Sequence, residues 1–79
     1  MTDTQLLDLF KEALTEVAPD KAAQFTSLTL ATSIEDLQVD SVTFMELVGA
    51  VEERVGRNFA DDELQRITTF ADLASLIRA

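Results

Sequence analysis

The chain has 79 residues, enough for one small domain with a single apolar core. Hydrophobic residues make up 47% of the sequence, too many for a disordered chain, and the absence of Cys and His excludes disulfide scaffolds, thiol nucleophiles and the commonest general base. The net charge of −9 disfavours anionic partners, so we expect binding neither to nucleic acid nor to an anionic membrane surface.

Nothing in the sequence indicates a membrane segment or a second domain. No apolar run approaches the roughly 20 residues that span a bilayer, and residues 1–10 lack the pattern of a signal peptide. There is no repeat, low-complexity run or linker. We therefore expect one domain over residues 1–79, acting as a free-standing, monomeric protein in the cytoplasm.

Helical periodicity begins near the N-terminus. Thr2 and Gln5 have the spacing of a capping box, in which each side chain accepts a hydrogen bond from the other residue's backbone amide. The apolar face that follows advances by three or four residues and consists of Leu7, Phe10, Leu14 and Val17. Pro19 disfavours helical geometry at Ala18 and should end the helix there.

Residues 20–33 are harder to assign. Pro19 could begin a short helical turn through Phe25, because a first-turn residue does not need the amide that proline lacks. A lone strand across Leu28 and Leu30 could not satisfy its backbone groups. We therefore expect a long loop, followed by a turn. The residues that fill the core from these segments should be Phe25, Leu28, Leu30, Ile34 and Leu37.

A second long helix should begin after Asp40, because an aspartate carboxylate accepts from the exposed amides of a first turn and suits the positive end of the helix dipole. Its buried face should consist of Phe44, Leu47, Val48, Val51 and Val55. Gly56 follows as the expected C-cap. A second, narrower apolar strip of Val42, Met45 and Gly49 fits two interpretations, wider contact with the core or a docking surface for a partner.

The last third of the chain predicts one short helix and one longer helix. The short helix should begin with three consecutive acidic residues, Asp61, Asp62 and Glu63. A calcium-binding loop would instead spread its ligands over about twelve residues, so we expect no metal site here. Thr69 should cap the last helix, with Asp72 three residues later. Its inner face should consist of Phe70, Leu73, Leu76 and Ile77. The expected fold is all-α, a four-helix bundle of three longer helices and one short helix, with a long loop between the first two helices.

Acidic residues are concentrated in the middle of the chain. Residues 35–63 hold nine acidic and two basic residues, whereas the rest of the chain holds six acidic and four basic residues. A partner steered by charge should therefore present a basic patch to this middle segment. An acidic surplus that only keeps a small domain soluble would produce the same composition.

Ser41 is the residue best placed to carry chemistry. Its only candidate bases are carboxylates, which at ordinary pKa are too weak to activate a hydroxyl, so we expect no enzyme activity. Ser41 should nevertheless lie at the first position of the second helix, where free amides and the helix dipole would favour a phosphate ester. A serine that is merely tolerated at a helix start is the simpler explanation.

The sequence around Ser41 resembles the prosthetic-group segment of acyl carrier proteins. That family has an acidic-Leu turn, then Asp-Ser-Leu, then Glu-Leu four residues after the leucine. Here Asp40-Ser41-Val42 and Glu46-Leu47 match in type and spacing, and the resemblance covers residues 34–77 as well as the length and pattern of the first helix. The aspartate before the serine favours acyl carriers over peptidyl carriers, in which glycine is usual at that position.

The resemblance implies that Ser41 carries 4′-phosphopantetheine, added from coenzyme A by a phosphopantetheinyl transferase, and that its thiol holds acyl groups as thioesters for fatty acid or polyketide biosynthesis. It also implies that acyl-processing enzymes recognise the second helix through basic docking patches. The partner-binding residues would be the apolar Val42 and Met45 and the acidic Asp40, Glu46, Glu52 and Glu53.

Three positions depart from the family pattern. Thr43 replaces a common acidic residue, Gly49 replaces a bulky apolar residue, and Phe44 stands where the family often has a small residue. A bulky ring at position 44 would narrow a cavity for acyl chains, which predicts short or polar acyl groups. The alternative to a carrier is a cofactor-free acidic helical interaction module that binds a basic partner through Val42 and Met45, and Ser41→Ala would separate the two.

Overall fold

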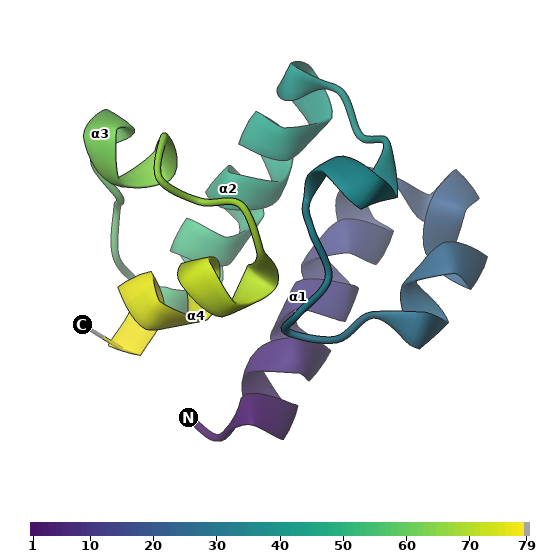
Figure 1. Ribbon diagram of the computed structural model, residues 1–79, viewed down its shortest axis with the longest axis horizontal. Helices are drawn as coiled ribbons and strands as arrows, with labels where there is room; N and C mark the ends of the chain where they lie inside the picture. The colour runs from purple at the N-terminus through teal and green to yellow at the C-terminus, as the bar shows by residue number, and fades with distance from the viewer. Residues whose placement is uncertain (79) are drawn as a thin grey trace.

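A computed structural model describes residues 1–78, and its first element is helix α1, Asp3–Val17 (Figure 1). The predicted capping box is confirmed: the Gln5 amide donates to Thr2 Oγ1 at 3.2 Å, and the Thr2 amide donates to Gln5 Oε1 at 2.9 Å. The buried face is centred slightly differently from the prediction. Its fully buried residues are Leu6, Phe10, Ala13 and Leu14, whereas Leu7 and Val17 are half-buried. Helix α2 and the segment after α1 both contact α1, and this widens the face that must be apolar.

The segment after α1 contains more helix than the sequence predicted. Pro19–Ser27 form the 3₁₀ helix η1, with Pro19 in its first turn, so the short helical turn considered from Pro19 through Phe25 is present and the long loop expected over residues 20–33 is confirmed only after Ser27. The Lys21 amide donates to the Ala18 carbonyl at 3.0 Å and the Leu28 amide to the Phe25 carbonyl at 3.1 Å. In Figure 1, η1 lies on one side of α1 and helix α2 on the other.

A loop and a second short 3₁₀ helix, η2 (Glu35–Leu37), connect η1 to α2. The predicted core residues Phe25, Leu28 and Leu37 are buried, while Leu30 and Ile34 are half-buried. After η2, Gln38 adopts the left-handed conformation with φ of 55°, and this turns the chain toward α2.

The loop is tied to the start of the last helix by backbone hydrogen bonds. The Ile34 amide donates to the Thr68 carbonyl at 2.9 Å, and the Ala71 amide donates to the Leu30 carbonyl at 2.8 Å. The Phe70 amide also donates to the Thr32 carbonyl, at 3.2 Å. Two segments far apart in sequence are therefore fixed to each other beside α2.

Helix α2 spans Ser41–Val55 and ends as predicted at Gly56, which has φ of 69° and whose amide donates to the Glu52 carbonyl at 2.9 Å. Its buried residues are Leu47, Val48, Ala50 and Val51, with Phe44 and Val55 half-buried at the two ends. The predicted buried face is thus confirmed at its centre. Within residues 1–78 no helix is long and apolar enough to cross a membrane.

Two shorter helices complete the fold: α3, Asp61–Leu64, and α4, Phe70–Arg78. At α4 the Asp72 amide donates to Thr69 Oγ1 at 3.3 Å, and the Thr69 amide donates to the Asp72 carboxylate at 3.0 Å, so the predicted cap is present. Helix α4 buries Phe70, Leu73 and Ala74, while Leu76 and Ile77 are half-buried. Among the described residues, no group of three or more acidic side chains is arranged to hold a metal ion.

The core is wholly apolar within residues 1–78. Phe10, Phe25 and Phe70 are its largest fully buried side chains, and the rings of Phe10 and Phe70 lie 5.4 Å apart between centroids at a tilt of 41°. These rings join α1, η1 and α4. The protein is therefore an all-α bundle with a long connection between its first two long helices, as the sequence predicted.

Candidate functional site

Ser41 lies exposed at the first position of α2. The preceding Asp40 is extended, and its carboxylate accepts from the Thr43 amide at 2.7 Å while its carbonyl accepts from the Phe44 amide at 2.9 Å. Capping by Asp40 therefore begins the helix at Ser41 and places the serine at the positive end of the α2 dipole.

Asp40 remains ionised under ordinary conditions. The hydrogen bond from the Thr43 amide is the main reason that the pKa of Asp40 lies below its ordinary value, and the nearby positive charge of Lys21 lowers it further. Lys21 belongs to η1, and its Nζ donates to the Gln38 carbonyl at 3.0 Å. The structure thus brings a cation to the turn before the serine, a neighbour 20 residues away that no sequence pattern indicated.

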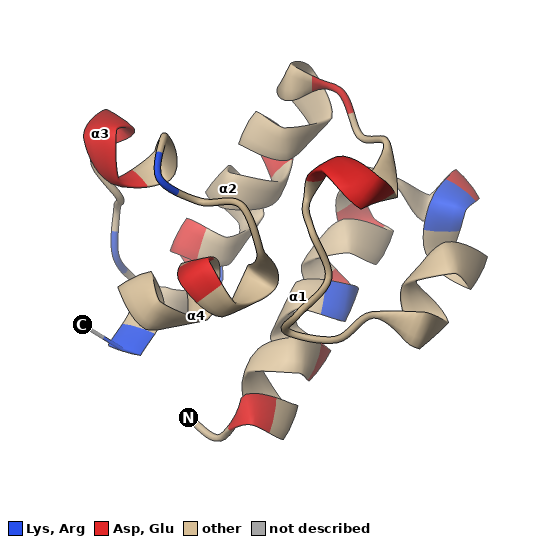
Figure 2. Cartoon of the chain, in the orientation of Figure 1, with Lys and Arg blue, Asp and Glu red and all other residues tan. Residues whose placement is uncertain are grey.

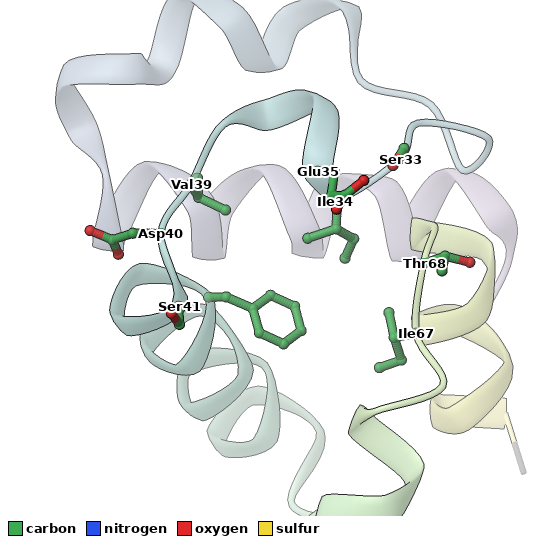
Figure 3. Close-up of a pocket in the computed structure, with 9 residues that line it drawn as sticks. Ser33, Ile34, Glu35, Val39, Asp40, Ser41, Ile67 and Thr68 are labelled. Atoms are coloured by element: carbon green, nitrogen blue, oxygen red, sulfur yellow. The ribbon is translucent and has the colours of Figure 1, made fainter.

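A cavity of about 370 Å³ adjoins Ser41. Figure 3 shows Ser41 on one side of this space, Ile67 and Thr68 on the opposite side, and Ile34 on the loop before α2. The lining residues are Ser33, Ile34, Glu35, Val39, Asp40, Ser41, Phe44, Ile67 and Thr68. The four apolar ones are half-buried, so their remaining exposed surface faces a space that an apolar group could fill.

The second apolar strip of α2 faces solvent. Val42 is 69% exposed and Met45 is 52% exposed, and Gly49 is exposed as well, so the interpretation of wider core contact is wrong. Glu46 and Glu53 are exposed and share this face by helical spacing. We call these five residues the α2 outer face.

Glu52 has a structural contact that its sequence position did not reveal. Its Oε2 accepts from the Phe59 amide at 2.7 Å, and the side chain is half-buried. It therefore holds the turn after α2 as well as contributing negative charge. Figure 2 shows acidic segments at η2, just before α2, on α2 and over α3.

The two basic residues of the acidic middle segment are both engaged in ion pairs. Arg54 Nη2 lies 2.7 Å from Glu16 Oε2 of α1, and Arg57 Nη2 lies 3.7 Å from Glu63 Oε2. The guanidinium of Arg57 also lies over the Phe59 ring, 5.3 Å from its centroid. Both arginines thus bridge elements of the fold, a role that their position in the sequence did not indicate.

Known proteins with similar sequences point to one family. The model of the family described as "Phosphopantetheine attachment site" matches residues 4–77. The acyl carrier protein of Thermobifida fusca is 27% identical over 77 residues, which are 98% of this chain and 95% of that protein. The acyl carrier protein of Rickettsia canadensis is 32% identical over 90% of this chain and 85% of that protein. The acyl carrier protein of Zymomonas mobilis is 38% identical over 77% of this chain and 72% of that protein. No solved structure shows significant similarity to the chain.

The chain is thus a phosphopantetheine-attachment domain. It belongs to the acyl carrier protein family, whose members are carriers and not enzymes. Membership implies a covalently attached 4′-phosphopantetheine group and interaction with a phosphopantetheinyl transferase and with acyl-processing enzymes. The residues present fit such a group, because an exposed serine hydroxyl at a helix N-terminus adjoins a partly apolar cavity.

Proposed function

We propose that this acyl carrier protein holds acyl groups as thioesters on 4′-phosphopantetheine attached to Ser41. The observation that carries the assignment is the placement of an exposed serine at the first position of α2, beside the cavity. The terminal thiol of the attached group supplies the thioester bond, which this chain without cysteine could not form itself.

The local charges suit a phosphodiester at Ser41. The first-turn amides and the dipole of α2 favour negative charge there. The ionised Asp40 carboxylate opposes it, but this carboxylate accepts from the Thr43 amide, and the positive charge of Lys21 acts on the same turn. We infer that Asp40 fixes the helix start while Lys21 offsets part of the surrounding acidity.

The α2 outer face, together with Asp40 and Glu52, is the proposed docking surface for partner enzymes. Exposed Val42 and Met45 offer apolar contacts, and Glu46, Glu53 and Asp40 offer charges to basic groups of a partner. Glu52 would add mainly charge, since its Oε2 already accepts from the Phe59 amide. Charge attraction speeds encounters without requiring a large interface, which suits a carrier that exchanges many partners.

We place the acyl-processing partners in fatty acid or polyketide biosynthesis, and we propose that a single monomeric domain in the cytoplasm does this work. The Asp40-Ser41 pair supports acyl rather than peptidyl cargo. A cofactor-free interaction module is the weaker alternative, because the matching family is described by phosphopantetheine attachment.

Intact-mass spectrometry tests the attachment site. The wild type, Ser41→Ala and Ser75→Ala are incubated with coenzyme A, magnesium and a broad-specificity phosphopantetheinyl transferase. Ser75 is the matched control, since it is an exposed serine on another helix. We expect one phosphopantetheinyl addition to the wild type and to Ser75→Ala, and none to Ser41→Ala. Absence of modification of folded wild type, with a control carrier modified in parallel, would overturn the proposal.

The docking surface is tested with the same transferase. Glu46→Lys and Val42→Asp should lower kcat/KM for modification, whereas Glu12→Lys, a charge reversal on the exposed side of α1, should leave it near the wild-type value. The Glu46 effect should shrink as salt is raised, because exposed charges are screened. Equal effects of Glu46→Lys and Glu12→Lys would show that only net charge matters and would refute a local docking surface.

A further inference from the structure

Phe44 forms part of the wall of the cavity beside Ser41. It lies three residues after Ser41, so both side chains extend from neighbouring positions on one side of α2, and both line the cavity. The ring is half-buried and packs against the apolar core. Phe44 therefore contacts the core and also lines the cavity.

Phe44 packs against a core that is filled by buried apolar side chains. Leu47 and Val48 follow it on α2 and are 0% and 1% exposed, and the paired rings of Phe10 and Phe70 fill the core between α1 and α4. Interiors of this kind are close-packed and leave few voids larger than a water molecule. A chain that entered from Ser41 would therefore meet Phe44 before it met any room between the helices.

The cavity also has a defined chemical character. Ile34, Val39, Phe44 and Ile67 make its apolar surface, and the acidic residues Glu35 and Asp40 also line it, with the Asp40 carboxylate directed away from the space (Figure 3). Its volume of about 370 Å³ is near the lower end of small-molecule sites, which run from roughly 300 to 1,000 Å³. It must accept the end of the pantetheine arm together with its cargo, and the negative charges of Glu35 and Asp40 nearby would disfavour an acidic acyl group.

We propose that Phe44 restricts the sheltered cargo of this carrier to short, uncharged acyl groups by closing the inner end of the cavity beside Ser41. The inference rests on the proposed attachment at Ser41. A short chain covers the half-buried apolar residues of the wall. A longer chain either leaves its far end in water or must displace a ring that the core holds.

The restriction is measured by how much the folded protein slows cleavage of the acyl thioester, which we call protection. The transferase loads Ser41 from butyryl-, hexanoyl-, decanoyl- and myristoyl-coenzyme A, and intact-mass spectrometry follows cleavage by neutral hydroxylamine. Free acyl-pantetheines of the same lengths give the unprotected rates. In the wild type, protection should rise from butyryl to hexanoyl and gain nothing from further methylenes.

Variants at the wall supply the comparison. In Phe44→Ala, protection should continue to grow with chain length, by about fourfold for each methylene that the enlarged cavity buries. In Phe44→Leu the growth of protection with chain length should be intermediate. This variant replaces Phe44→Ala in the comparison if far-UV circular dichroism shows Phe44→Ala to be unfolded. Val55→Ala is the matched control, a half-buried residue of the same helix that does not line this cavity, and should keep the wild-type profile.

The outcomes separate the two proposals. Wild-type protection that keeps rising through decanoyl and myristoyl, or the same length profile in the wild type and in the folded Phe44 variants, would overturn the role of Phe44 while leaving attachment intact. Failure of every acyl-coenzyme A, and of coenzyme A itself, to add mass at Ser41 would instead overturn the attachment on which the inference rests.

Discussion

The two glycines of the chain should respond in opposite ways to alanine. A methyl group added at Gly49 or at Gly56 would meet no heavy atom within 4 Å apart from the adjacent residues and the backbone of the helix itself, so packing does not distinguish the two sites. Their backbones do: Gly49 lies in the middle of α2, whereas Gly56 has a positive φ of 69° at the end of that helix.

Gly49→Ala should raise the free energy of unfolding by about 0.5–1 kcal/mol, because glycine costs that much relative to alanine inside a helix. For a domain of this size the melting temperature should rise by about 2–8 °C. Gly56→Ala should lower the free energy of unfolding by about 1 kcal/mol, since a left-handed conformation costs a residue with Cβ about 1–2 kcal/mol and the gain from a stiffer unfolded chain offsets only part of it.

Urea denaturation followed by far-UV circular dichroism measures both variants on the same scale. The slope of free energy against urea should be unchanged, because neither substitution alters the surface exposed on unfolding appreciably. Shifts of the same sign in the two variants would refute the argument, since they would show that open space around the added methyl group, rather than backbone conformation, decides the outcome.

Three further perturbations test the fold and the site. The Asp72 carboxylate accepts from the Thr68 and Thr69 amides at 2.9 and 3.0 Å and from the Thr68 hydroxyl at 2.8 Å, and these bonds lower its pKa from 3.8 to about 2. Asp72→Ala should therefore melt below the wild type near neutral pH, with a difference that shrinks as the pH falls from about 4 to about 2; a constant difference would contradict this. Leu47→Ala, at a fully buried position, should lower the free energy of unfolding by about 2–5 kcal/mol in urea titrations, and a loss under 1 kcal/mol would show that the core collapses around the gap. In Lys21→Met, carbon-detected NMR titration should show the pKa of Asp40 rising yet remaining below its ordinary value, because the Thr43 amide still donates to it; an unchanged pKa would exclude an effect of Lys21.

Local capping was predictable from the sequence, because each cap depends on residues within three or four positions of one another. The caps of α1 at Thr2 and Gln5, of α2 at Asp40 and of α4 at Thr69 all follow from side-chain chemistry at fixed spacing. The end of α2 at Gly56 was predictable for the same reason.

Features set by packing were not predictable in the same way. Helix η1 has one buried residue, Phe25, so it shows no apolar period to distinguish it from a loop. The small residues Ala13, Ala50 and Ala74 are buried, yet alanine carries little apolar signal on its own. The hydrophobic pattern of the sequence therefore did not predict that these alanines would be buried.

Part of the candidate site was predictable from local sequence, and part depends on the tertiary fold. Ser41 and the composition of the α2 outer face come from one continuous stretch, and the sequence indicated both. The cavity needs Ile34 from the loop before α2 and Ile67 from the segment after α3, and Lys21 reaches the site from η1. Only the tertiary fold brings these residues together.

The hydrogen bonds between the loop and the start of α4 also bear on how the cavity opens. Ile34 and Thr68, which line it on two sides, are joined through their own backbones, and the Ala71 amide is bonded to the Leu30 carbonyl. These walls should behave as one cooperative unit, with the amides of Ile34, Phe70 and Ala71 exchanging their hydrogens at similar rates. Breathing of the cavity would then occur mainly at the contact with α2. With attachment at Ser41 as proposed, cargo would enter and leave on the side of the cavity nearest that serine.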